Sequence, residues 1–276
     1  MNRSEMRLFA CVLCLFLLSG AIPLFGQQRR VVRKNVNQQQ QSGQSHWLQV
    51  EVGAASSELD GEFVLDEGKG DSNVDLDGNL QLDDDLSGRA RVQLQVAEGS
   101  QFRLGYYGIE YEETAQLNSS ITVDGNTYNA SDRVKSRVQL DTYEIGFVQN
   151  LTSSESFSLD GLFQVNVVDF EAELDNETSG QSVDKSQRVP IPYPGLRIEV
   201  NSTDWLGFFG EARYVTGSYD DTDYTSSDLE AGVKFNLKSG YDIRVGYRRF
   251  NYDVEVDESE LDLTTEGPYA SFTFRF

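Results

Sequence analysis

The sequence ends in GPYASFTFRF, residues Gly267–Phe276, and this stretch decides the expected fold. From Ala270 onward apolar and polar residues alternate, a period that is typical of a β-strand with two unlike faces. Phe272, Phe274 and Phe276 occupy the apolar face. An aromatic strand edge in water promotes aggregation, whereas a barrel in a membrane covers that face with lipid and that edge with its first strand. The stretch therefore predicts a transmembrane β-barrel.

The N-terminus predicts export. A charged start, Met1–Arg7, precedes the apolar run Leu8–Leu18, which is shorter than the ~20 residues of a membrane-spanning helix. We therefore expect a signal peptide over residues 1–26 rather than a membrane anchor. Both cysteines, Cys11 and Cys14, lie in this segment, so no disulfide is expected after its removal. Residues 27–45 are polar and Gln-rich, and predict a flexible periplasmic arm.

Nine segments upstream of the terminal stretch show the same alternation. The expected strands are residues 47–55, 89–96, 101–112, 138–151, 157–172, 189–200, 205–217, 228–237, 241–254 and the terminal stretch. Connections after the even-numbered strands are short, and most of the others are longer and acidic, as in outer-membrane barrels. We therefore predict an all-β fold: a closed antiparallel transmembrane barrel of about ten strands over residues 46–276, with eight as the alternative. An even count puts both termini on the short-turn, periplasmic side.

The second face of these strands carries nearly balanced charge, although the chain has a formal net charge of −22. Isolated buried charges are costly, while mutually paired ones persist. We therefore predict a narrow lumen filled by ion pairs. A soluble β-sandwich would not require a continuous apolar row on every strand. The predicted network consists of Glu51, Arg89, Arg91, Arg103, Glu144, Asp160, Arg197, Glu199, Glu211, Arg213, Asp228, Glu230, Lys234, Arg244, Arg248 and Arg275.

Aromatic residues near the strand ends predict two girdles at the membrane interfaces. Ordinary core aromatics are the alternative, and they would show no such banding. On the short-turn side the predicted girdle contains Trp47, Phe102, Phe147, Phe157, Trp205, Phe235, Tyr241 and Phe276. On the long-loop side it contains Tyr106, Phe170, Tyr193, Tyr214, Phe250 and Tyr252.

An exported chain of alternating strands that ends in Phe272–Phe276 resembles small outer-membrane β-barrel proteins of the OmpA, OmpX and OmpW type. The resemblance covers residues 46–276 by pattern. It implies a bacterial outer-membrane location with lipid around the barrel. It also implies that the barrel-assembly machinery recognises Phe272, Phe274 and Phe276. A monomer is expected, and the acidic composition argues against a nucleic-acid partner.

One segment matches the spacing of a calcium-binding loop. Residues 73–84 place oxygen-bearing side chains at positions one, three and five, glycine at six and a carboxylate at twelve. The candidate ligands are Asn73, Asp75, Asp77, Asn79 and Asp84. Strand alternation in an acidic hairpin produces the same letters, so both interpretations stay open. No other cofactor is predicted.

Pro190, Pro192 and Pro194 remove three N–H donors from one edge of a predicted strand. The simpler interpretation is that this strand leaves the ladder early. The alternative is a lateral opening for a lipophilic molecule, which the resemblance to OmpW-like barrels also suggests. The one histidine, His46, is expected to be a polar residue at the periplasmic rim. With no catalytic constellation, we predict a non-enzymatic barrel in a structural or surface-interaction role, the alternative being a narrow porin or lateral channel.

Overall fold

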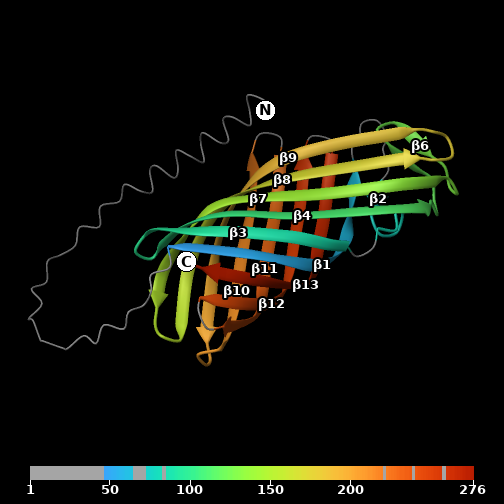
Figure 1. Ribbon diagram of the computed structural model, residues 1–276. Helices are drawn as coiled ribbons and strands as arrows, with labels where there is room; N and C mark the ends of the chain where they lie inside the picture. The colour runs from blue at the N-terminus through green and yellow to red at the C-terminus, as the bar shows by residue number, and fades with distance from the viewer. Residues whose placement is uncertain (1–46, 65–72, 83–84, 220–221, 238–239, 257–258) are drawn as a thin grey trace, which may run out of the picture. The chain divides into compact units, whose positions relative to one another are not determined.

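The computed structural model describes residues 47–64, 73–82, 85–219, 222–237, 240–256 and 259–276 (Figure 1). The described residues contain no helix long and apolar enough to span a membrane. Almost all of them lie in strands, whose bounds are β1 (Leu48–Val64), β2 (Val74–Asp75), β3 (Asp85–Ala97), β4 (Ser100–Gln116), β5 (Ile121–Val123), β6 (Asn126–Tyr128), β7 (Arg133–Ser153), β8 (Phe157–Asn176), β9 (Ser182–Asn201), β10 (Leu206–Tyr219), β11 (Thr222–Leu237), β12 (Tyr241–Val256) and β13 (Ser259–Arg275).

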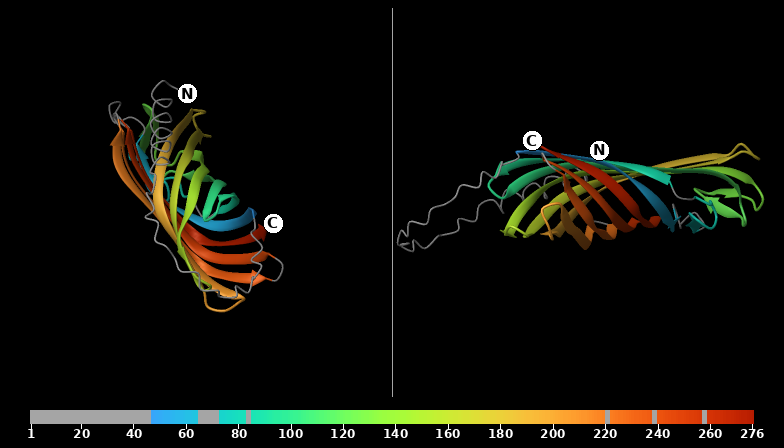
Figure 2. Two further views of the ribbon diagram at one scale, coloured as in Figure 1. Left: turned by 90° about the vertical axis from the view of Figure 1, so that its left-hand side faces the viewer. Right: turned by 60° about the horizontal axis from the view of Figure 1, so that its bottom comes forward.

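Ten of these strands form a closed antiparallel barrel, in the order β13-β12-β11-β10-β9-β8-β7-β4-β3-β1. The C-terminal strand closes it, with Phe272 opposite Val52 and Phe274 opposite Val50 of β1. The N–H of Phe276 donates to the carbonyl of Leu48 at 2.9 Å, so the last residue still belongs to the seam. Figure 2 shows the curved wall from two further sides. The predicted fold is confirmed.

Large apolar side chains point outward around the barrel wall next to the end that holds Leu48 and Phe276. They include Val52, Leu104, Ile145, Phe147, Leu196, Ile198, Phe208, Leu229 and Val245, each more than a third exposed. Exposure of this kind on every side of a barrel is favourable only when lipid covers it. We call this zone the apolar belt, the end with Leu48 and Phe276 the terminal end, and the opposite end the distal end.

Three connections expected to be long acidic loops are instead mostly strand. β8 continues to Asn176 and β9 begins at Ser182, so only a tight turn separates them. The pairs β10–β11 and β12–β13 likewise reach residues 219–222 and 256–259. The prediction of long loops there was wrong because the alternation continues beyond the belt, with acidic residues in the outward positions.

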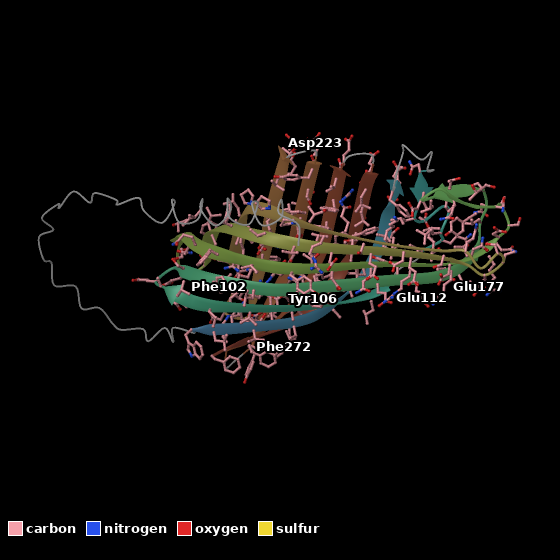
Figure 3. All side chains as sticks on the ribbon, turned by 90° about the horizontal axis from the view of Figure 1, so that it is seen from above. Phe102, Tyr106, Glu112, Glu177, Asp223 and Phe272 are labelled. Atoms are coloured by element: carbon pink, nitrogen blue, oxygen red, sulfur yellow. The ribbon has the colours of Figure 1, made fainter. Side chains whose placement is uncertain are left out.

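The apolar residues change face where a strand leaves the belt. On β1, Val52 points outward, whereas Leu59 and Phe63 are buried inside and Asp60 is exposed. Figure 3 shows the outward row of β4 passing from aromatic residues to Glu112. A strand presents apolar residues to lipid in the membrane, but beyond it the outer face meets water and the inner face must be apolar. This change of face marks the distal limit of the belt.

The distal interior is a packed apolar core. Leu59, Phe63, Ile109, Val138, Phe170, Tyr193, Phe250, Tyr252 and Leu263 of the barrel strands contribute to it. Two segments from the connections cover it: residues 73–82, which bury Leu76, Leu80 and Leu82, and the β5–β6 hairpin, which buries Tyr128. The hydroxyl of Tyr128 donates to the carbonyl of Leu174 at 3.3 Å. The distal end of the barrel is therefore filled rather than hollow.

The distal aromatic girdle differs from the predicted one. Tyr106 and Tyr214 are exposed as expected. Tyr143 and Tyr247, which were not predicted, are exposed beside them. The prediction was wrong for Phe170, Tyr193, Phe250 and Tyr252, which are buried in the distal core, because these residues occupy the inward positions of their strands.

Phe63→Ala tests the distal core. Phe63 is 1% exposed, and truncating a buried phenylalanine costs about 3–5 kcal/mol. We expect the purified variant in detergent to unfold at a lower urea concentration. The fraction of folded protein is measured from the difference in migration between boiled and unboiled samples. Asp60→Ala, on the exposed face of the same strand, is the control and should change stability by less than about 0.5 kcal/mol. Equal urea midpoints for the two variants would contradict the conclusion that the distal core stabilises the barrel.

Candidate functional site

The interior at the level of the apolar belt is a network of ion pairs. Every residue of the predicted network faces the interior and makes at least one ion pair. Strands place them there because they alternate with the lipid-facing row, so each strand contributes charges to the same enclosed space. The network is the most distinctive chemical feature of the described residues.

Arg213 on β10 forms the centre of the network. Its side chain is fully buried and contacts Glu144 at 3.4 Å, Asp228 at 3.1 Å and also Glu211. Arg103 reaches Glu211 through two hydrogen bonds of 2.8 and 3.2 Å. A guanidinium that is removed from water needs this surrounding negative charge, because an unpaired buried charge costs several kcal/mol.

A second group of charges joins β1 to β3 and β11. Glu51 lies between Arg89 at 3.4 Å and Arg91 at 3.8 Å. Arg89 also contacts Glu230 at 3.1 Å, and its guanidinium stacks 4.6 Å from the ring centre of Tyr269. The Tyr269 hydroxyl donates to Glu230. These contacts fix the seam between the first and last strands from the inside.

The sequence analysis missed one member of the network, Asp242 on β12. It is fully buried and contacts Arg244 at 3.3 Å and Arg275. Asp242 follows directly after the turn that begins β12, so it resembles a turn residue in sequence. The outward positions of Tyr241 and Ile243 on either side were the available signal, because they place Asp242 on the inner face.

A cavity of about 290 Å³ opens at the terminal end of the barrel. Its lining is polar and includes Asp160, Arg197, Glu199, Arg244 and Arg275. A smaller cavity of about 10 Å³, enough for one water molecule, lies deeper, beside Arg89, Tyr107, Arg248 and Tyr269. Ion pairs of the network surround both cavities, and the apolar core lies on the distal side of the second.

The three prolines lie where the pairing of β9 with β10 ends. The last pair is Gly195 with Arg213, whereas β8 pairs with β9 along its whole length. The N–H of Asn201 donates to Ser156 at 2.8 Å, on the β8 side. Because alternate residues turn their backbone groups to opposite neighbours, the even-numbered residues of β9 face β10. The N–H groups missing at Pro190, Pro192 and Pro194 are thus missing from the β10 side.

A packed interior lies behind this split between β9 and β10. Ile191 and Tyr193, which alternate with the prolines, are fully buried. The hydroxyl of Tyr193 makes a hydrogen bond with Ser226 of β11. The structure therefore places the prolines at the end of a ladder that is backed by the distal core.

Three of the candidate calcium ligands make hydrogen bonds within the protein. Asp75 Oδ1 accepts the N–H of Gly78 at 2.8 Å, and Asn79 Oδ1 accepts the N–H of Asp75 at 3.0 Å. Asn73 donates to Glu62 at 2.7 Å. Asp77 is exposed on the same turn. Asp84 and His46 lie outside the described residues. Among the described residues no three His, Cys, Asp or Glu side chains gather as they would around a metal ion.

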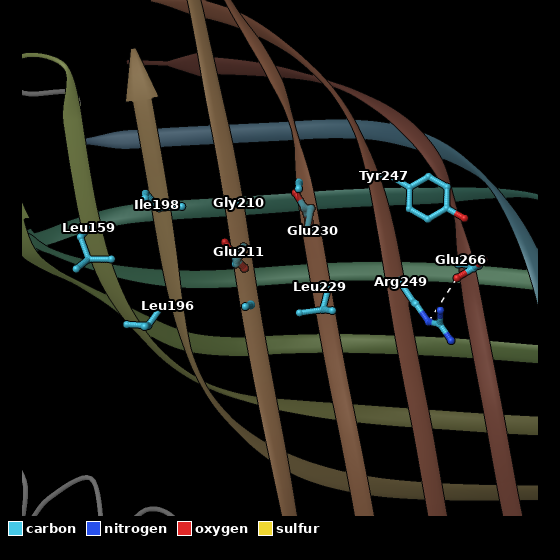
Figure 4. A pocket seen from close by; sticks show the side chains of 12 residues that line it. Leu159, Leu196, Ile198, Gly210, Glu211, Leu229, Glu230, Tyr247, Arg249 and Glu266 are labelled. Carbon is cyan, nitrogen blue, oxygen red and sulfur yellow. Dashed lines mark ion pairs between the residues drawn. The ribbon is translucent and has the colours of Figure 1, made fainter. Parts of the chain in front are cut away.

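A depression of about 710 Å³ lies on the outside of the wall (Figure 4). The small residues Gly210, Ala212 and Ala231 form its floor, and Leu196 and Leu229 lie beside them. Arg249 and Glu266, 3.4 Å apart, border it on the distal side. Because the depression belongs to the apolar belt, it is a lipid-facing surface and not part of the lumen.

The chain is similar in fold to the solved structure of an outer-membrane protein. No protein-family model matches the chain, and no curated protein matches its sequence. The outer membrane protease OmpT from Escherichia coli is 8% identical, with a TM-score of 0.57, over 83% of this chain and 96% of that one. Ail, the attachment invasion locus protein of Yersinia pestis, is 13% identical, with a TM-score of 0.39, over 82% and 97%. The toluene transporter TodX of Pseudomonas putida is 9% identical, with a TM-score of 0.36, over 83% and 89%.

The likeness to OmpT shows a shared barrel fold, and with so few identical residues it shows nothing further. The apolar belt indicates that this barrel is embedded in a membrane. The chain thus has the fold of a small outer-membrane β-barrel protein.

Glu211→Leu tests the central ion pairs. Glu211 is the one carboxylate within ion-pair distance of Arg103 among the described residues, so the variant leaves Arg103 buried and uncompensated. Breaking a buried pair in this way costs about 3–5 kcal/mol, which urea unfolding in detergent would measure. The double variant Arg103→Met/Glu211→Leu removes both charges and should recover a large part of the loss. A double variant no more stable than Glu211→Leu would show that Arg103 does not depend on Glu211.

Proposed function

We propose that this protein is a non-enzymatic barrel of the outer membrane with a structural or surface-interaction role. The observation that carries the proposal is the double closure of its interior. Ion pairs fill the barrel within the belt, centred on Arg213, and the apolar core fills it beyond the belt, where Leu76 and Tyr128 are fully buried. A solute would have to displace both.

The alternative function, a narrow porin or lateral channel, has less support. The cavity at the terminal end is bounded by ion pairs, and the split beside Pro192 is backed by Ile191 and Tyr193. Passage would require disrupting paired charges in a low-dielectric interior, which is costly. Toluene transport is a function of TodX and does not follow for this chain from a shared fold.

An enzymatic role also has little support in the residues. The chain has a single histidine, His46, and its cysteines lie in the predicted signal peptide. Acid–base or nucleophilic chemistry at neutral pH most often uses such groups. The ionisable residues in the interior of the barrel pair with one another. The protease activity of OmpT does not follow for this chain from a shared fold.

We further propose that the distal end faces the outside of the cell and that both termini are periplasmic. All connections at the terminal end are short, whereas the two that join β1 to β3 and β4 to β7 at the distal end are long. Short turns on one side and longer connections on the other are typical of the periplasmic and outer sides. Lipid surrounds the belt, assembly depends on the C-terminal aromatic residues, and the barrel is a monomer that binds no nucleic acid.

The distal outer surface of β1, β12 and β13 is strongly acidic, which suits a surface role. Glu62 lies opposite Asp262, which in turn lies opposite Asp253, and Glu255 lies opposite Glu260. Partial burial, and then the neighbouring carboxylates of Asp253 and Glu62, raise the pKa of Asp262. Like charges on facing strands repel each other, so this surface favours cationic partners.

Single-cysteine labelling tests the orientation, because the predicted mature chain has no cysteine of its own. Glu177 lies in the distal β8–β9 turn and Glu98 in the terminal-end β3–β4 turn, and both are exposed. On intact cells a membrane-impermeant maleimide should label Glu177→Cys and leave Glu98→Cys unlabelled, while both react after lysis. Labelling of Glu98→Cys alone in intact cells would reverse the proposed orientation.

Planar-bilayer recording tests the closed interior. Purified protein should give no regular conductance steps in 1 M KCl, because ion pairs and the apolar core close the barrel. A porin of known conductance, inserted in the same bilayers, is the control for insertion and detection. Steady single-channel steps from the folded, heat-modifiable protein would favour the channel alternative.

A further inference from the structure

The distal part of β10 has an open backbone edge. Beyond Arg213, residues Tyr214–Tyr219 pair with β11 and, among the described residues, with no strand on the other side. The carbonyl of Trp205 accepts the N–H of Asn236 of β11 at 2.8 Å. Odd-numbered residues of β10 therefore bond to β11, and even-numbered ones turn their N–H and C=O groups to the open side. We call the backbone groups of Tyr214, Thr216 and Ser218 the β10 edge.

The chain's own neighbouring strand cannot complete this edge. Continuing the register of Gly195 with Arg213 would place Pro194, Pro192 and Pro190 opposite Tyr214, Thr216 and Ser218. Each of these proline positions lacks the N–H that the facing carbonyl requires. Pairing of β10 with β9 thus stops at the first proline, beyond which the carbonyls of β10 would face positions without an N–H group.

Other distal edges carry features that discourage strand addition. β4 loses its partner β3 beyond Gly108, and its outward residues there include Glu110 and Glu112. The N–H of Thr114 is taken by the carboxylate of Glu113 at 2.9 Å. Charged and self-satisfied edges are how proteins avoid unwanted pairing.

β1 shows the same protection beyond its pairing with β3, where Glu58 and Asp60 are exposed on its outer face. The β10 edge has none of these features. Residues Tyr214–Tyr219 read Tyr-Val-Thr-Gly-Ser-Tyr, without charge or proline, and are rich in residues that favour strands. A strand of this composition with open backbone groups is suited to receive another strand.

The charge next to the β10 edge indicates the chemistry of its partner. Ser218 lies opposite Asp223 of β11, and Asp223 lies opposite Glu255 of β12; both carboxylates are exposed. These residues continue the acidic distal surface of a chain with a net charge of −22. Lysine or arginine side chains on an added strand would relieve the repulsion between the facing acids.

We propose that the β10 edge binds an extended, basic segment of another polypeptide by strand addition. Three backbone positions, at Tyr214, Thr216 and Ser218, supply the hydrogen bonds, and the ring of Tyr214, 58% exposed, offers apolar contact beside the prolines of β9. The biological setting rests on the proposed orientation, which puts this edge outside the cell.

A second copy of the chain is a poorer occupant. Two barrels in one membrane carry their β10 strands in the same sense relative to the membrane normal. Their edges would therefore meet as parallel strands, and each copy would bring the acidic residues Asp223 and Glu255 to the contact, which adds repulsion between like charges. An antiparallel self-pairing would need one of the two barrels to be inverted.

The test measures binding of a fluorescein-labelled octapeptide of alternating lysine and valine to the purified barrel in a zwitterionic detergent, by fluorescence anisotropy. We expect saturable binding at low salt. Thr216→Pro removes the central donor of the β10 edge and should weaken binding at least tenfold. Glu112→Pro makes the same backbone change on the β4 edge and should alter binding less than twofold. The migration shift on boiling verifies that each variant is folded.

A second variant tests the edge without changing β10. Replacing Pro190, Pro192 and Pro194 with valine restores the three donors to β9, so that β9 can pair with β10. We expect the triple variant to bind the peptide with an affinity at least tenfold lower than that of the wild type. The fully N-methylated peptide, which cannot donate backbone hydrogen bonds, should not bind to the wild-type protein.

Four results would overturn the proposal: no saturable binding to the wild type, equal binding to Thr216→Pro, equal binding of the N-methylated peptide, or equal binding of a glutamate–valine peptide. A dimer in detergent that dissociates on Thr216→Pro would assign the edge to a second copy instead. Because the assay uses purified protein, its outcome does not depend on the orientation, which the cysteine labelling tests separately.

Discussion

The need to pair every charge inside the belt is the constraint on which the rest of this structure depends. A wall whose outer face meets lipid must place its polar residues inward, and ten strands enclose a space too narrow to leave those residues in bulk water. Arg213 illustrates the result: its buried guanidinium is surrounded by Glu144, Glu211 and Asp228, contributed by β7, β10 and β11. The contact with Glu144 joins β10 to β7, and the contact of Arg103 with Glu211 joins β4 to β10. Neither pair of strands is adjacent in the sheet, so these contacts tie the wall together across its interior.

Outside the membrane the same strands follow the opposite rule. Beyond Ala55 of β1 the outer face meets water and becomes acidic, while the inner face becomes apolar and packs around Phe63 and Leu76. One continuous ladder thus spans two environments by changing which face is apolar. The functional consequence is that the ion-pair network and the distal apolar core each close the interior. A rearrangement of one alone does not open a path for a solute through the barrel.

Much of this was predictable, because alternation over eight or more residues determines both the strand and its faces. The belt segments of all ten strands and the inward charges follow from that pattern alone. The distal extensions were missed because a stretch such as Glu171–Asp175, with acids at alternate positions, has the composition of a loop. Asp242 was missed at a strand end, where a turn and a first inward residue look alike. Phe250 and Tyr252 share the inward face of β12 with Arg244 and Arg248, so alternation places them inside. The girdle prediction failed there because it grouped aromatic residues by their distance from the strand end and not by face.

The split between β9 and β10 shows that the hydrogen-bonded wall is complete in one part of the barrel and interrupted in another. Hydrogen bonds in a lipid environment cannot be left unmade, and the ladder is intact up to Gly195 and Arg213, within the belt. The interruption begins at Pro194, at the level of Tyr214 in the distal aromatic girdle, so the open backbone groups lie from the membrane interface outward. A defect of packing would be expected to expose the core, yet Tyr193 and Ile191 seal it from inside. The missing pairs therefore open a backbone edge without opening the barrel, which separates a binding function of the wall from any transport function of the lumen.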